Sequence, residues 1–195
     1  MQYARSASGD ASRALVRVLT MFVLAYSSYL SISYANLKPL LDRYLPLQLP
    51  FKSIAVVGGL MYVVWICLAY RLCGSGFGVA TALVTASLCL ATSPWFGVLN
   101  PWWFSAFGVL SFLVAGILCE KVNGAAANAC FALTNWIAAY AYRVAPISLP
   151  HAVLGLAIAI ASGALGDALA RGLSKLLYSA KFLRSYYEFV GIAKT

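Results

Sequence analysis

Aromatic and amide side chains carry most of the binding chemistry available in this chain. Tryptophan rings can stack on a flat ligand, while asparagine amides, tyrosine and histidine can exchange hydrogen bonds with it. Such groups are costly at membrane depth, so each must find a partner in the protein or in a ligand. The residues of these types nearest the outer ends of the predicted spans are the candidate substrate-binding residues: Trp95, Asn100, Trp102, Trp103, Asn135, Tyr140 and His151.

Each of these residues also has a simpler explanation. Tryptophans at span ends can form an interfacial belt, although a belt normally marks both interfaces and this bias is one-sided. Asn135 can bond another helix as well as a ligand. His151 follows Pro150 and suits the start of a helix better than a metal site, so no metal site is expected.

Catalytic groups are sparse. The single histidine has no orienting carboxylate nearby, and no phosphate-binding Gly-Lys-Ser loop is present. Five cysteines occur without a C-x-x-C pair, which is typical of small apolar filler. We therefore expect neither an enzyme nor a bound cofactor. The acids are scattered, and one of them forms an i,i+4 pair with Arg171: Asp10, Asp42, Glu120, Asp167 and Glu188.

The composition requires a membrane to hold these residues in place. Of 195 residues, 63% are apolar and 10% are charged, and the mean hydropathy is +0.85. These values exclude a soluble enzyme, a disordered tail and a disulfide-framework domain. The sequence predicts an all-α, multi-pass protein of the cell membrane.

The positions of the charges predict six transmembrane helices, since one crossing needs about 20 apolar residues. Arg17 and Lys38, for example, enclose 20 uncharged residues. A signal peptide over residues 1–35 is the competing interpretation of the first segment. The predicted spans divide a single membrane domain, residues 1–195, near 18–36, 53–71, 76–93, 100–119, 124–142 and 149–170, and a basic amphipathic helix follows at about 167–189.

Basic residues are distributed unequally between the two sides. The side that would hold both termini carries ten lysines and arginines, and the other side carries four. The positive-inside rule places both termini in the cytoplasm. The net charge of +9 is then explained by inner-leaflet lipids and requires no nucleic acid.

Two other features concern partners and access. The first outer connection, residues 36–52, is either a loop lying in the interface or a gate over an outward-facing cavity. Lines of small residues mark close helix packing or contacts with another subunit. These lines are Gly155/Ala159/Gly163, Ser162/Gly166/Ala170, Ala82/Ala86 and Ala7/Ala11/Ala14.

The chain resembles the S component of energy-coupling-factor (ECF) transporters. The resemblance covers the stretch from Gly58 to Gly116, including S-P-W-F-G at 93–97, and the tail ASGALGDALARGLSKLL from Ala161 to Leu177. The turn is most similar to the hydroxymethylpyrimidine/thiamine-precursor branch. In that family an A-x-x-x-A line on the first helix docks a coupling subunit, and Ala7, Ala11 and Ala14 are the matching residues, although they precede the apolar span.

The resemblance implies capture of a vitamin or vitamin precursor from the outer side. The bound molecule would pass to an importer that contains a membrane coupling subunit and ATPase subunits. The ligand would lie between spans four, five and six, under the first loop. The alternative is a structural or accessory membrane subunit without a ligand, and a membrane-embedded enzyme or a proton-coupled carrier is a more distant possibility.

Overall fold

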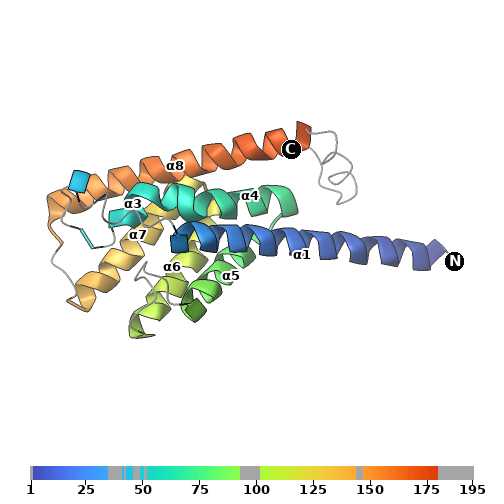
Figure 1. The fold of residues 1–195 in the computed structure, drawn as a ribbon, viewed down its shortest axis with the longest axis horizontal. Coiled ribbons are helices and arrows are strands. Elements are labelled where there is room, and N and C mark those ends of the chain that lie inside the picture. The colour runs from blue at the N-terminus through green and yellow to red at the C-terminus, as the bar shows by residue number, and fades with distance from the viewer. Residues whose placement is uncertain are drawn as a thin grey trace.

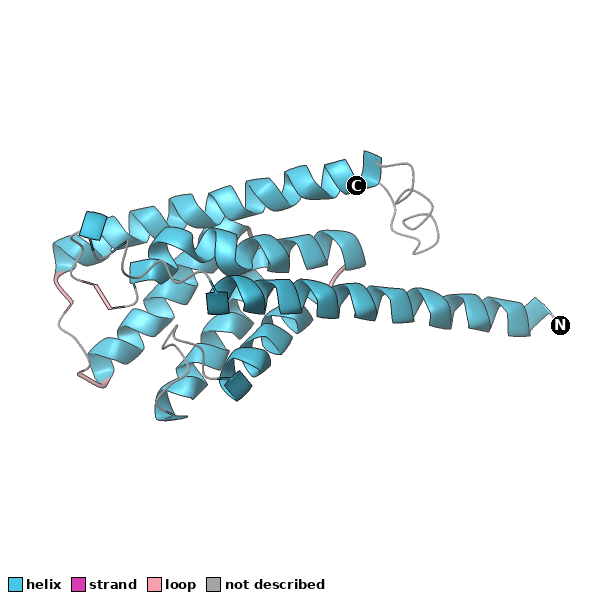
Figure 2. Ribbon diagram, viewed as in Figure 1, coloured by secondary structure: helices cyan, strands magenta, loops and turns pink. Residues whose placement is uncertain are grey.

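The structure is a computed structural model of the chain (Figure 1). It describes residues 2–34, 41, 43–45, 49–50, 52–92, 102–143 and 147–179, with side chains at all of these except 2–10 and 102–104. The described residues form helices and short loops, with no strand among them (Figure 2). The predicted all-α class is confirmed.

The helices follow one another as long antiparallel segments. The second segment, Lys52–Cys73, is one continuous helix whose middle is a π-helical turn. The elements are α1 (Gln2–Tyr34), α3 (Lys52–Gly58), η1 (Gly59–Val63), α4 (Val64–Cys73), α5 (Phe77–Thr92), α6 (Trp102–Lys121), α7 (Gly124–Ala141) and α8 (Leu149–Ser179).

Four helical segments coincide with predicted spans to within two or three residues, and the first and last are longer. The first helix begins at Gln2 rather than near residue 18, because residues 2–17 contain no proline and only one glycine. Helix α8 continues to Ser179, so it includes the first part of the amphipathic helix predicted at 167–189. The rest of that helix, from residue 180, lies outside the described residues.

Three helices are long and apolar enough to cross a membrane. They are Ala11–Tyr34 in α1, Lys52–Cys73, and Leu149–Ser179. The start of α1 projects beyond the other helices, as Figure 1 shows in dark blue. These lengths and compositions fit the membrane location that the sequence predicts.

The Lys52–Cys73 helix is the centre of the bundle. It is 67% buried over its most apolar window, against 28% for α1 and 33% for α8. Its Tyr62 ring lies 4.4 Å from the ring of Phe131 on α7 and 5.7 Å from that of Phe112 on α6, measured between centroids. This buried aromatic cluster joins the central helix to α6 and α7.

Small residues allow α8 to approach the central helix closely. A Cβ atom on Gly59 would lie 1.8 Å from the backbone oxygen of Ser162, and one on Gly166 would lie 2.2 Å from the oxygen of Gly59. Neither distance is possible for a real Cβ atom. The Gly155/Ala159/Gly163 and Ser162/Gly166/Ala170 lines are both buried, as is Ala82/Ala86 on α5, so these three lines pack helices within the molecule.

The π-helical turn leaves backbone groups that side chains from other helices satisfy. The Gly59 N–H donates to Ser162 Oγ at 3.0 Å, and Ser28 Oγ donates to the Met61 carbonyl at 3.4 Å. Serine hydroxyls commonly satisfy backbone groups that a helix irregularity frees inside a membrane. Helices α1 and α8 therefore hold this turn from two sides.

Candidate substrate-binding pocket

Contacts between distant residues define two ends of the bundle. At one end Arg71 meets Asp167, the Glu120 carboxylate accepts from the Gly76 N–H, and Gly124 packs on Gly163. At the other end Trp136 contacts residues 49–50 and Gly155. We call these the Asp167 end and the Trp136 end.

A pocket of about 310 Å³ opens at the Trp136 end, between the last turns of α7 and the first turn of α8. On α7 its lining residues recur every three or four positions, which is the spacing of one helix face. The pocket is apolar apart from one phenol and one indole. Its lining residues are Leu133, Trp136, Ile137, Tyr140, Ile147, Leu149 and Ala152.

The end of the first connection packs beside this pocket. The Trp136 indole N–H donates to the Pro50 carbonyl at 2.9 Å. A Cβ atom on Gly155 would meet Leu49 Cδ1 at 2.4 Å and Trp136 Cη2 at 2.9 Å, so a larger residue there would have to displace one of these side chains. Leu49 is buried by these contacts. Residues 49–50, at the described end of the first connection, thus pack against α7 and α8.

Asn135 is in the interior of the bundle, away from the pocket. Its amide donates to Ser111 Oγ on α6 at 2.9 Å and to the Phe131 carbonyl at 2.8 Å. Asn135 and Tyr140 are about 140° apart around α7, because each residue turns the helix by about 100°. The Asn135 Oδ1 atom is buried and has no hydrogen-bond partner among the described residues. The structure therefore does not bring Asn135 and Tyr140 into one site.

Tyr140 and His151 both lie at the Trp136 end. The Tyr140 side chain is 70% exposed and lines the pocket. His151 Nδ1 is within hydrogen-bonding distance of Ser148 Oγ, in the segment that begins α8. This contact matches the helix-start explanation of His151. In the sequence, His151 precedes the lining residue Ala152 and is two positions after Leu149.

The other predicted site residues are placed only in part. Trp95 and Asn100 lie outside the described residues. Trp102 and Trp103 are the first two residues of α6, and their side chains are not among those described. The predicted docking residues are all on α1, where Ala11 and Ala14 are exposed and Ala7 is described by its backbone alone.

Asn128 is a buried polar residue that the sequence interpretation did not select. It accepts a hydrogen bond from the Tyr62 hydroxyl and donates to the Ala159 carbonyl of α8 at 2.9 Å and to the Ala55 carbonyl at 3.5 Å. All its hydrogen-bonding groups are satisfied within the protein, which indicates a structural role. The sequence feature that could have identified Asn128 is its position on an apolar helix, seven residues before Asn135.

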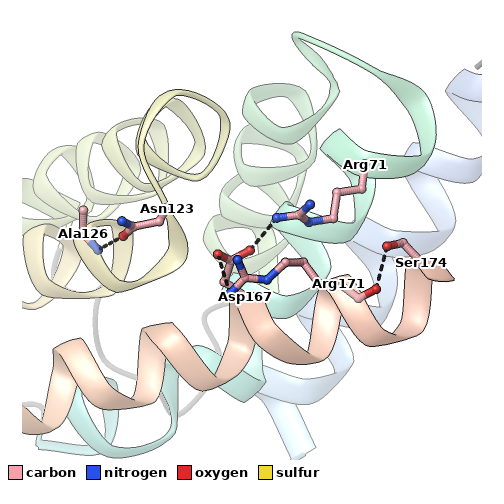
Figure 3. Close-up of polar contacts among 6 residues, drawn as sticks. All are labelled: Arg71, Asn123, Ala126, Asp167, Arg171 and Ser174. Atoms are coloured by element: carbon pink, nitrogen blue, oxygen red, sulfur yellow. Dashed lines mark hydrogen bonds and ion pairs between the residues drawn. The ribbon is translucent and has the colours of Figure 1, made fainter. Parts of the chain in front are cut away.

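The Asp167 end contains a buried ion pair that joins α4 to α8 (Figure 3). Asp167 is 5% exposed, and its Oδ1 lies 2.9 Å from Arg71 Nη2. The predicted i,i+4 pair with Arg171 also forms, but at 3.6 Å and with a more exposed guanidinium. Arg71 is therefore the closer partner of this carboxylate.

Cysteines and possible metal ligands show no reactive grouping in the described part of the chain. The five cysteines have free thiols, four of them buried and Cys130 partly so. Among the described residues, no group of three or more His, Cys, Asp or Glu side chains could hold a metal ion. Binding through shape and apolar contact is the chemistry that the described pocket offers.

The pocket residues other than Tyr140 were not selected from the sequence as binding residues. Leu133, Trp136 and Tyr140 follow helical spacing, but apolar residues at such spacing usually face a core or lipid. Only the packing of residues 147–152 at the start of α8 against α7 creates a hollow there. No protein-family model matches the chain, and no curated protein or solved structure matches it either.

Proposed function

We propose that the protein is a six-span subunit of the cell membrane with both termini in the cytoplasm. The two-ended arrangement supports this topology, since residues 71, 76, 120, 124 and 167 meet at one end, and residues 49, 50, 136 and 155 meet at the other. On the positive-inside rule the Asp167 end is cytoplasmic. Exposed Arg171 and Lys175 on α8 would there face anionic inner-leaflet lipids.

Within that topology, the protein captures a small vitamin-like molecule at its outer end, as an S component of an ECF-type importer does. The observation that carries this proposal is the pocket beside Trp136, whose indole bonds Pro50 at the described end of the first connection. Ligand sites of this kind are concave, mostly apolar and largely preformed. One aromatic stack or hydrogen bond contributes about 1 kcal/mol, so tight capture needs several contacts and a closed loop.

Handing the ligand onward would require a membrane coupling subunit and ATPase subunits. The Gly155/Ala159/Gly163 and Ala82/Ala86 lines are buried inside the molecule, whereas Ala11 and Ala14 are exposed. Small residues allow the helix backbones of two membrane subunits to approach closely. The exposed start of α1 is therefore the surface we assign to the coupling subunit.

One observation favours the alternative of an accessory subunit without a ligand. Helix α1 exposes a long apolar face in addition to its alanines, and such a face suits permanent packing against another membrane protein: Leu15, Leu19, Phe22, Val23 and Tyr26. A hydrocarbon environment accounts for the same face equally well. The pocket is therefore the observation that favours ligand capture over an accessory role.

Purification of the tagged protein from its own membranes separates the two functions. An importer subunit should co-purify with a second membrane protein and an ATPase pair, and the purified complex should hydrolyse ATP. Recovery of the protein with membrane partners that have no ATPase activity would overturn the importer assignment and favour the accessory one.

A further inference from the structure

The walls of the pocket limit the chemical class of its ligand. Five of the seven lining residues are aliphatic, and the polar atom of Trp136 is already bonded to Pro50. Among the side chains that line the pocket, the Tyr140 hydroxyl then remains as the polar group that a ligand can bond. A charged ligand group buried here would have no opposite charge from these walls, which is strongly unfavourable. Charge complementarity therefore favours a neutral ligand.

The exposed lining residues show which side of the pocket is open. Leu149 is 77% exposed, Ile137 is 63% exposed and Tyr140 is 70% exposed. Val153, one turn beyond Leu149 on α8, is 61% exposed and continues the same apolar surface. Because α8 is apolar enough to span a membrane, this surface would face lipid hydrocarbon in the proposed topology.

The described end of the first connection, residues 49–50, lies behind the Trp136 wall of the pocket and is not among the lining residues. Leu49 is 8% exposed where it packs against Gly155 and Trp136, and Pro50 holds the Trp136 indole. The exposed residues Ile137, Tyr140 and Leu149 therefore form the open side of the pocket, which a molecule dissolved in the bilayer would reach directly.

We propose that the pocket takes a neutral, largely apolar ring compound that arrives laterally from the outer leaflet and stacks on the exposed Tyr140 ring. The inference rests on the proposed capture function and specifies its substrate class. The pocket volume of about 310 Å³ is near the lower limit for small-molecule sites, and it suits a compound of two or three rings. A small polar end could reach the Tyr140 hydroxyl.

Two probes in lipid nanodiscs test this inference with the intact protein. N-phenyl-1-naphthylamine is neutral and apolar, and its fluorescence rises on binding. Thiamine is charged and water-soluble, and its binding is measured by equilibrium dialysis. Empty nanodiscs give the background for both. We expect saturable, protein-dependent binding of one naphthylamine probe per protein and no saturable binding of thiamine.

A matched pair of variants locates the probe. Ala152→Trp fills the pocket and should weaken naphthylamine binding by about tenfold or more. Ala161→Trp, at an exposed position on the same helix, should bind as the wild type does. If Ala152→Trp does not fold, Tyr140→Ala and its exposed counterpart Tyr26→Ala provide a second pair.

Each outcome decides a different claim. Saturable thiamine binding that Ala152→Trp abolishes would overturn the neutral, bilayer-derived ligand and leave capture intact. Naphthylamine binding that is absent, or equal in Ala152→Trp and Ala161→Trp, would also overturn the inference. The capture function itself is judged separately, by co-purification with the ATPase pair.

Discussion

Arg71 and Asp167 are 96 positions apart in the sequence, yet Arg71 Nη2 lies 2.9 Å from Asp167 Oδ1. The contact joins the last turn of α4 to the second half of α8. The Tyr178 hydroxyl also bonds the Arg71 carbonyl at 3.3 Å, so α8 contacts Arg71 at two points. This pair holds the central helix to α8 at the Asp167 end.

Removing Arg71 should destabilise the protein, because a buried carboxylate would lose its nearest counter-charge. We expect Arg71→Gln to lower the free energy of unfolding by about 3 kcal/mol, the low end for a broken buried pair, since Arg171 remains nearby. Thermal unfolding in detergent measures the change. Arg171→Gln, which removes a more exposed partner, should cost about 0–1 kcal/mol.

The double variant Arg71→Gln/Asp167→Asn provides the control for that prediction. Without the carboxylate, the loss of Arg71 leaves no uncompensated buried charge, so much of the stability should return. Equal destabilisation by Arg71→Gln and by the double variant would show that Arg71 acts through packing alone.

Helix positions could be predicted from the sequence, but contacts between helices could not. Lys52 and Pro150 mark the starts of helices because charge and proline act locally. The partner of Asp167 could not be found in this way, since Arg171 is also at bonding distance along the helix and Arg71 is close only after α4 and α8 pack. The hydrogen bond between Tyr62 and Asn128 could not be predicted for the same reason, because it joins residues of two different helices.

The sequence drew attention to the region between residues 133 and 152, where the pocket lies, but it did not define the pocket. Tyr140 and His151 flank one short connection, and of the two only Tyr140 lines the pocket. Asn135 was included among the candidate binding residues because of its depth in the predicted span. Its side chain lies on a different face of α7 and bonds Ser111. The hollow itself depends on how the start of α8 packs against the end of α7, which no local pattern encodes.

The close approach of α8 to the central helix gives a second prediction. Gly166→Ala would place a Cβ atom 2.2 Å from the Gly59 carbonyl oxygen, so the helices must separate and the folded yield should fall sharply. Gly172→Ala on the same helix meets no atom within 4 Å and should be neutral or up to about 1 kcal/mol more stable. Size-exclusion profiles and thermal unfolding compare the two. Normal stability in Gly166→Ala would contradict the packing described.

Asn135 should contribute to stability more than to ligand retention. Asn135→Ala leaves Ser111 without its amide partner and should cost about 1–2 kcal/mol of unfolding free energy. Tyr140→Ala, at an exposed position, should leave unfolding unchanged and weaken ligand retention. Thermal unfolding combined with mass spectrometry of retained small molecules measures both quantities. A stable Asn135→Ala protein that has lost its ligand would place Asn135 in the binding site.

The docking surface on α1 predicts a separation of binding from transport. Ala11→Trp adds bulk to an exposed small-residue line near the start of α1, so in the proposed importer the coupling subunit should no longer co-purify. Ligand retention should remain, because the Trp136 end is unchanged. Ala161→Trp serves as the control on α8. Undiminished co-purification in Ala11→Trp would exclude this face of α1.

Capture of a small molecule beside Trp136 is the central claim, and native mass spectrometry of the intact protein tests it most directly. The protein is released from its own membranes under gentle conditions, and its mass is compared with that of Ala152→Trp and Ala161→Trp. We predict one bound molecule per protein in the wild type and in Ala161→Trp, and none in Ala152→Trp. A wild-type protein that carries no bound molecule under several growth conditions would contradict the claim.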